Sequence, residues 1–341
     1  MRRTYLRPAG LVYGPDAAEL ARQGRGASLG GLSAIAYTLL ERIERTAPGS
    51  LTRRFETGVL PQSTVLPAFL DAARPLVMGI VNVTPDSFSD GGLAAGTDRA
   101  IAHGAELARQ GADILDVGGE STRPGSDGVP EDEELRRVLP VIEALSSEGF
   151  AVSVDTRKAR VMRAALKAGA KIVNDVSALT FEPQAMEAMA EASCPVILMH
   201  AQGDPKTMQL SPQYDDVALD VYDWLAARIE ACEKAGIARH RLIADPGIGF
   251  GKSFRHNLDV LRQFTLYHGL GVPLLMGLSR KGFIGALTGE KIAGQRVHGS
   301  VGGAVWAALH GAHILRVHDV KATVEALAVA QAALEPGTSG L

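Results

Sequence analysis

The sequence predicts an α/β protein whose main part is a single (β/α)8 TIM barrel with an N-terminal extension. From about residue 76, short runs rich in Val and Ile alternate with longer segments that carry apolar residues at helical spacing. Eight such units fit into about 260 residues, close to the ~250 residues usual for this barrel. An open, doubly wound sheet would gather its functional groups at one switch point. Here polar residues follow all eight predicted strands, which favours the closed barrel.

The composition limits the classes of partner. The chain has 341 residues, 46% of them hydrophobic, and its 35 basic and 38 acidic residues give a formal net charge of −3. This excludes a broad basic face for nucleic acid, so an anionic ligand needs a local cluster of Lys and Arg. Cys194 and Cys232 are too few for a disulfide framework and have no metal-binding spacing. With no apolar run of signal-peptide or membrane-span length, we expect a cytoplasmic protein without a membrane partner.

The predicted strands and their ends come in order along the chain. The strands cover residues 77–82, 113–118, 151–155, 172–175, 195–199, 241–245, 273–277 and 313–317, and helical segments such as 131–147 and 215–235 follow them. The polar strand ends carry Asn82; Glu120, Thr122 and Arg123; Asp155; Asn174; Met199 and His200; Asp245; Ser279 and Lys281; and Arg316 and His318. Barrel enzymes place their catalytic residues at these ends.

Residues 1–75 do not follow the barrel alternation. An amphipathic stretch around residues 32–44 precedes a region with Pro, Gly and Thr that runs to Pro75. About 70 residues can barely hold a core alone, so we expect the extension to pack on the barrel or across an oligomer interface. The barrel then spans residues 76–335, and the tail 336–341 is predicted to fray.

The segment MGIVNVTPDSFSDGG at 78–92 starts as a buried strand and becomes a long polar loop, which is where a lid over the barrel mouth would lie. An ordinary solvated loop is the alternative. Asn82 can offer a carbonyl oxygen to a hard cation or to a water on a diphosphate. Phe88 could close over a flat ligand or pack under its own loop. In the next such loop, GGESTRPGSDG at 118–128, Arg123 is either an anion contact or a surface partner of Glu131 or Asp132.

Three apolar strands end in Asp155, Asn174 and Asp245, within SVDTRK, IVNDVSAL and IADPGIGFGK. A carboxylate in such a place is costly to bury unless it meets donors. The donor is either an internal partner, such as Lys281 or Arg157, or a ligand edge with two parallel N–H groups, as in a pterin. The residues alone leave both alternatives open.

The segment GIGFGKS at 247–253 is not a phosphate-binding P-loop, because the first glycine of that pattern is replaced by Pro246. Its glycines instead let the backbone and Phe250 approach a planar ligand. At the ends of strands seven and eight, Lys281, Arg316 and His318 form the local cationic site where such barrels often hold phosphate. Salt bridges to neighbouring aspartates are the alternative use of these cations.

Together, MGIVNVTPDSFSDGG, GGESTRPGS, SVDTRK, VNDVSAL, ADPGIGFGK, GLSRKGFIG and ILRVHDV resemble the dihydropteroate synthase family of pterin-binding barrels, over roughly residues 76–335. The resemblance implies condensation of 6-hydroxymethyl-7,8-dihydropterin diphosphate with 4-aminobenzoate, with release of diphosphate, in folate biosynthesis. It also implies Mg²⁺ as cofactor and a homodimer formed through barrel helices.

The resemblance implies a role for each matching residue. The pterin site comprises Asp155, Asn174, Met199, Asp245, Lys281 and Arg316, with Asp155, Lys281 and Arg316 as the catalytic set. Asn82, Arg316 and His318 hold the diphosphate, and Asn82 also binds the metal. The 4-aminobenzoate pocket comprises Phe88, Thr122, Arg123, Pro124, Phe250, Ser279 and Gly282. Gly282 is a departure, because many relatives have serine after this lysine and Gly282 retains only its backbone N–H.

Three other functions are conceivable for this pattern. A pterin-dependent methyltransferase of the same barrel family is the main alternative, but it has no use for the cationic strand ends. A catalytically silent scaffold barrel would have lost several of the polar ends. A phosphosugar aldolase or isomerase needs a Schiff-base lysine or a paired acid and base.

Because an arylamine is a weak nucleophile, we expect a dissociative substitution assisted by cations at the leaving group.

Overall fold

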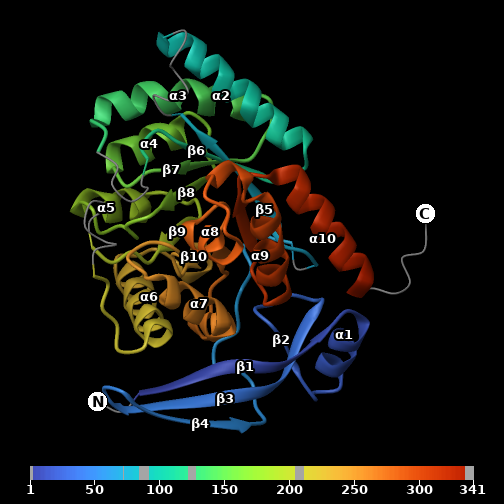
Figure 1. Ribbon diagram of the computed structural model, residues 1–341. Coiled ribbons are helices and arrows are strands. Elements are labelled where there is room, and N and C mark those ends of the chain that lie inside the picture. The colour runs from blue at the N-terminus through green and yellow to red at the C-terminus, as the bar shows by residue number, and fades with distance from the viewer. Residues whose placement is uncertain (1–2, 72, 84–91, 122–127, 204–210, 335–341) are drawn as a thin grey trace.

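The computed structural model describes residues 3–71, 73–83, 92–121, 128–203 and 211–334 (Figure 1). Two parts are evident. A β-sheet with one helix forms the N-terminal part, and alternating strands and helices form the remainder. Among these residues, no helix has the length and apolar character needed to cross a membrane.

Eight parallel strands form the barrel, hydrogen bonded in the order β10-β9-β8-β7-β6-β5-β12-β11. An isolated bridge between Ala244 and Leu274 joins the two ends of this order and nearly closes the barrel. The predicted eight-stranded α/β barrel is therefore confirmed. The strands are β5 (Leu76–Asn82), β6 (Ile114–Gly118), β7 (Val152–Asp155), β8 (Ile172–Asp175), β9 (Val196–Met199), β10 (Leu242–Asp245), β11 (Leu275–Met276) and β12 (Ile314–Val317).

Helices surround the barrel (Figure 1). They are α2 (Gly92–Arg109), α3 (Glu131–Ser147), α4 (Ala159–Lys167), α5 (Pro183–Glu191), α6 (Val217–Lys234), α7 (Phe254–Arg262), α8 (Gly282–Thr288), α9 (Val297–Leu309) and α10 (Val320–Leu334), with 3-10 turns η2 (Arg239–Arg241), η3 (Phe264–Leu270) and η4 (Ala293–Gln295). The prediction for α3 is confirmed. Helix α6 begins two residues later than predicted, because Asp216 caps it by accepting the backbone N–H groups of Ala218 and Leu219, each at 3.1 Å.

Apolar side chains fill the lower half of the barrel interior. Met78, Ile114, Ile172, Ile197 and Ile243, from strands β5, β6, β8, β9 and β10, belong to one buried cluster. Leu66, Phe69 and Leu70, from the segment that enters the barrel, pack against the same cluster. The amino ends of the strands are therefore closed by apolar packing, and the polar strand ends gather at the opposite mouth.

The N-terminal extension forms an antiparallel sheet beside α6 and α7 (Figure 1). Its elements are β1 (Arg3–Tyr13), α1 (Pro15–Arg22), β2 (Ala27–Ser28), β3 (Ile35–Ala47) and β4 (Ser50–Glu56). The amphipathic stretch is mostly strand β3. Tyr5 and Ile43 share a buried cluster with Ala218, Leu219 and Leu266 of the barrel. The extension thus buries part of its apolar surface on the barrel.

Candidate active site

A cavity of about 780 Å³ opens at the carboxyl ends of the barrel strands. Its wall includes residues of β5, β7 and β12 and of the loops after β6, β10 and β11. The predicted site residues in this wall are Asn82, Asp155, Phe250, Ser279, Lys281, Gly282, Arg316 and His318. Residues from distant parts of the chain therefore meet around one space.

Arg316 is held between two acidic side chains from other strands. Its Nε donates to Oδ2 of Asp116 at 2.6 Å, and its Nη2 donates to Oδ2 of Asp155 at 2.7 Å. Asn174 donates from Nδ2 to the same oxygen of Asp116 at 3.0 Å. Residues of β6, β7, β8 and β12 thus form one hydrogen-bonded unit. The buried acid Asp155 has Arg316 as its partner, and neither Lys281 nor Arg157 fills that place among the described contacts.

Asp116 is not among the predicted site residues, although an acid inside the apolar strand ILDVG is a signal for it. It is fully buried. Its second oxygen, Oδ1, has no hydrogen-bond partner among the residues that the structure describes. A buried acceptor of this kind is costly unless a donor is supplied, which is consistent with a ligand-binding role.

Burial raises the pKa of Asp155 to about 7, although the nearby Arg316 guanidinium acts in the opposite direction. Asp116, Glu134 and Asp175 add to the rise through charge repulsion. Asp155 is therefore divided between its neutral and ionised forms near neutral pH. A perturbed carboxyl group in a cavity is typical of a functional site.

Lys281 and Asp245 lie close enough for each to alter the pKa of the other. Burial lowers the pKa of Lys281 to about 7, and Asp245 opposes this effect. Burial likewise raises the pKa of Asp245, which accepts the Gly247 backbone N–H at 2.7 Å. Lys281 Nζ donates to the Ile248 carbonyl and lies 4.2 Å from the centre of the Phe250 ring. The ammonium group therefore holds the loop after β10 against the cavity.

Lys252, the lysine of GIGFGK, is buried below this loop. Its Nζ lies 2.8 Å from Nδ1 of His200 and donates to the carbonyls of Gly247 at 2.9 Å and Phe250 at 3.2 Å. Burial lowers its pKa well below the ordinary value. These contacts agree with the exclusion of a P-loop, because the side chain is used to fold its own loop.

His318 and Ser279 form a second polar corner of the cavity. The backbone N–H of His318 donates to Ser279 Oγ at 3.2 Å, and the ring Nδ1 lies 3.1 Å from the same oxygen. Asp319 instead accepts a hydrogen bond from Arg280 Nε at 3.0 Å. The alternative of salt bridges to neighbouring aspartates is therefore met by Arg316, which pairs with Asp155, whereas Asp319 pairs with none of Lys281, Arg316 and His318 among the described contacts.

Other predicted site residues are not in the cavity wall or lie outside the described residues. Asn174, Met199 and Asp245 are buried and do not line the cavity. Phe88, Thr122, Arg123 and Pro124 lie outside the described residues. Two acids were considered as partners of Arg123. These acids, Glu131 and Asp132, both pair with Arg160. Arg157, considered as a partner of Asp155, pairs instead with Glu120 at 2.5 Å.

Comparison with known proteins matches this barrel to one family. A family model described as pterin binding enzyme matches residues 78–318. The dihydropteroate synthase of Escherichia coli (strain K12) is 51% identical over 266 residues, which cover 78% of this chain and 94% of that protein. The chain belongs to the dihydropteroate synthase family. Members of this family are transferases, and so is this protein.

Solved structures of the dihydropteroate synthase family share the fold. Xanthomonas albilineans dihydropteroate synthase with 4-aminobenzoic acid is 55% identical, with a TM-score of 0.73, and the match covers 76% of this chain and 93% of that chain. The same enzyme in complex with 7,8-dihydropteroate is 52% identical, with a TM-score of 0.70, and the match covers 76% and 94% of the two chains. Because the family model begins at residue 78, the N-terminal sheet lies outside it.

Proposed function

We propose that this transferase condenses 6-hydroxymethyl-7,8-dihydropterin diphosphate with 4-aminobenzoate to form 7,8-dihydropteroate and diphosphate, a step of folate biosynthesis. One observation carries the proposal: the Arg316, Asp116, Asp155 and Asn174 unit lies at the same barrel mouth as Lys281 and His318. The barrel mouth thereby brings together two kinds of group. Hydrogen-bond acceptors suit a heterocycle whose edge carries N–H donors, and cations suit its leaving group. The relatives that bind 4-aminobenzoic acid and 7,8-dihydropteroate support this choice of substrates.

The pterin would lie over the buried end of the cavity. A carboxylate can accept two parallel N–H groups, so Asp245 is suited to the amino and ring N–H of the pterin edge. Asn174 and Asp155 would form hydrogen bonds with the remaining polar positions of the pterin ring, and Met199 would form an apolar wall of the pterin site. Arg316 has both ends of its guanidinium held by acids, which leaves its flat face for stacking on the ring.

The diphosphate would lie toward Asn82, Arg316 and His318. We propose Mg²⁺ as the cofactor, because it binds through few protein oxygens and keeps substrate phosphates and waters as its other ligands. Asn82 fits this mode, because it ends β5 at the cavity wall and its side-chain carbonyl oxygen is a ligand type that Mg²⁺ accepts. When bound, Mg²⁺ would neutralise charge that develops on the departing diphosphate.

The 4-aminobenzoate would lie at the outer part of the cavity. Phe250 and Ser279 are placed in its wall, together with Gly282, the first residue of α8. The backbone N–H of Gly282 is suited to the benzoate carboxylate. Phe88, Thr122, Arg123 and Pro124 would complete this pocket.

The chemistry follows from the weak nucleophilicity of the arylamine. The bond between the pterin methylene carbon and the diphosphate oxygen breaks, and its electron pair leaves with the diphosphate. Asp155 in its ionised form stabilises the positive charge spread over the dihydropterin, while Arg316 and His318 stabilise the leaving group. The amine lone pair then forms the C–N bond, and the surplus proton passes to solvent.

The direct test is release of diphosphate by the purified protein. We expect release that requires both substrates and Mg²⁺, and that falls about 100-fold or more in Asp155→Asn. Asn82→Ala should raise the Mg²⁺ concentration needed for half-maximal rate. A protein that transfers a methyl group instead, with no diphosphate released, would support the methyltransferase alternative.

The cellular setting forms a further part of this proposal. A cytoplasmic location is supported by two unpaired cysteines, the buried Cys232 and the half-buried Cys194. We also propose a homodimer through barrel helices, as the resemblance to the dihydropteroate synthase family implies. Sedimentation measurements of molecular mass would test the dimer.

A further inference from the structure

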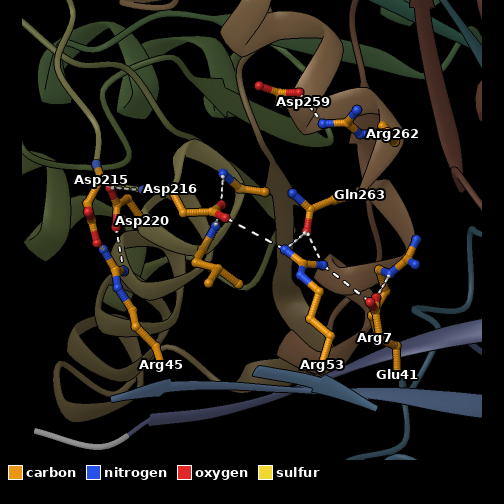
Figure 2. Close-up of polar contacts among 12 residues, drawn as sticks. Arg7, Glu41, Arg45, Arg53, Asp215, Asp216, Asp220, Asp259, Arg262 and Gln263 are labelled. Atoms are coloured by element: carbon orange, nitrogen blue, oxygen red, sulfur yellow. Dashed lines mark hydrogen bonds and ion pairs between the residues drawn. The ribbon is translucent and has the colours of Figure 1, made fainter. Parts of the chain in front are cut away.

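The hairpin formed by β3 and β4 of the N-terminal sheet holds the start of α6, as Figure 2 shows. Arg45 Nη1 donates to Oδ1 of Asp220 at 2.6 Å, and Arg45 Nη2 pairs with Asp215. On the neighbouring strand, Arg53 lies 3.7 Å from Asp216. The three acids come from the first turn of α6 and the residues before it.

The contact of Arg45 with Asp215 and Asp220 is stronger than an isolated ion pair on the surface. Only 17% of the Arg45 side chain is exposed, and it forms two charge-assisted contacts. Asp220 also accepts the backbone N–H of Asp215 at 2.8 Å and of Asp216 at 3.3 Å. The carboxylate that binds Arg45 therefore also fixes the backbone just before α6.

Tyr214, the neighbour of Asp215, connects this backbone to the loop after β10. Its hydroxyl donates to the Gly251 carbonyl at 2.8 Å, and its ring meets the His256 ring edge-on at 5.1 Å. Gly251 has a φ of +61°, and a Cβ there would lie 2.4 Å from the carbonyl oxygen of Gln202. The loop is therefore closely packed at the point where Tyr214 holds it.

Gly251 stands between two residues of the cavity wall, Phe250 and Lys252. The Phe250 carbonyl accepts a hydrogen bond from Lys252 at 3.2 Å, and its ring lies 4.2 Å from Lys281 Nζ. A displacement of Gly251 would therefore move the ring and the ammonium group that face the substrates. A continuous series of contacts runs from the extension to the reaction site.

We propose that the N-terminal sheet positions the loop of residues 247–252, which contributes Gly249, Phe250 and Lys252 to the cavity wall, through Arg45, Asp215 and Tyr214. Arg45 and Tyr214 are positioning residues, and the extension is an accessory part of the active site. Rigid support of this kind matters because small displacements of binding groups weaken substrate positioning. The inference takes only the identity of the affected substrate, 4-aminobenzoate, from the proposed function.

The apolar contact between extension and barrel makes the link testable. Tyr5 and Ile43 pack with Leu219 and Leu266, and the Tyr5 hydroxyl donates to Asp223 at 2.9 Å. We expect the apolar contacts to remain when the Arg45 side chain is shortened, so that the sheet stays docked. A change in the cavity wall then reports the Arg45 contact itself.

The experiment combines amide hydrogen exchange of residues 247–252 with steady-state kinetics. Arg45→Gln and Tyr214→Phe should each speed exchange in this loop and raise the KM for 4-aminobenzoate by about three- to tenfold, with kcat within about twofold of the parent. Arg54→Gln is the matched control, because Arg54 is 66% exposed and pairs with Glu44 and Glu56 of its own sheet. We expect the control to behave as the parent.

The double variant Arg45→Gln/Tyr214→Phe should show no more than the larger single effect, because both changes interrupt one series of contacts. Equal exchange rates in Arg45→Gln and Arg54→Gln would overturn the proposal, as would effects that multiply in the double variant. The exchange measurement needs no turnover, so it tests the positioning role even if the protein releases no diphosphate. Absence of diphosphate release would refute the proposed function and not the positioning role.

Discussion

Arg316 and Asp155 form a direct hydrogen bond, from Nη2 to Oδ2 at 2.7 Å, across the mouth of the barrel. Oδ2 of Asp116 accepts a hydrogen bond from Nε of the same guanidinium at 2.6 Å. The cation that would assist the leaving group is thus oriented by the carboxylates that would face the pterin. Binding and departure of the leaving group are linked through one side chain.

The pH dependence of activity should follow from Asp155 and Lys281. The pKa of Asp155 is raised to about 7 and that of Lys281 is lowered to about 7. In the proposed mechanism, catalysis needs ionised Asp155, gained as pH rises, and protonated Lys281, lost as pH rises. We therefore expect a bell-shaped profile of kcat/KM centred near 7, which reports the free enzyme.

Lys281→Arg should abolish the alkaline limb of this profile, because arginine keeps its charge. Lys291→Arg, at an exposed position, should leave the profile unchanged. A profile that is flat from about pH 5 to about pH 9 would contradict the assignment.

Acid should loosen the junction of extension and barrel through two buried histidines. His313 Nε2 lies 2.8 Å from the Gly30 carbonyl of the extension, and the His268 ring is its neighbour. Burial lowers the pKa of His268 to about 3 and that of His313 to about 4, from ordinary values of 6.5. Both rings are thus neutral in the folded protein, and the unfolded chain takes up protons first as the pH falls.

The stabilisation is fully present above about pH 6.5 and is lost between there and about pH 3 to 4, with a slope near 1.4 kcal/mol per pH unit for each ring. Denaturant unfolding across this range measures it. His268→Gln should flatten the dependence, and His103→Gln, at an exposed site on α2, should not. Equal slopes in the two variants would refute the role of His268.

The loop after β10 should not tolerate a side chain at Gly247. Its φ is +67°, and a Cβ would lie 1.9 Å from the His200 carbonyl oxygen. We expect Gly247→Ala to lower the free energy of unfolding by about 2–4 kcal/mol and to weaken substrate binding. Gly302→Ala on α9, away from the cavity wall, is the control, since no atom lies within 4 Å of its added Cβ. Thermal unfolding and kinetics would compare the two, and similar behaviour would count against the close packing of this loop.

The barrel was predictable because its signals are local. Buried strands such as β9 read as short apolar runs, and α3 begins with four acidic residues after Pro130. Strand β11 has only two residues, whereas the predicted strand covers 273–277. Pro273 before it and Gly277 after Met276 limit its hydrogen bonding to neighbouring strands. The amphipathic stretch in the extension is a strand because its pairing with β1 and β4 is long-range, and one sequence does not reveal such partners.

The candidate site was predictable as a set of strand ends, but its pairings were not. Asp155 could have met several cations, and only the order of strands places Arg316 beside it. The signal for Asp116 is weak, because a single acid within an apolar strand has no distinctive spacing. The link from Arg45 to Tyr214 joins segments about 170 residues apart, and no motif marks it.

The central claim is that Asp245, beside Lys281, binds the pterin at the barrel mouth. Its most direct test is the dissociation constant for the dihydropterin diphosphate, measured by titration calorimetry without 4-aminobenzoate. We predict that Asp245→Asn weakens binding by about 100-fold, because an amide cannot accept two N–H groups as a carboxylate does, while Asp259→Asn on α7 has no effect. A folded Asp245→Asn protein that binds the ligand as tightly as the parent would contradict the claim.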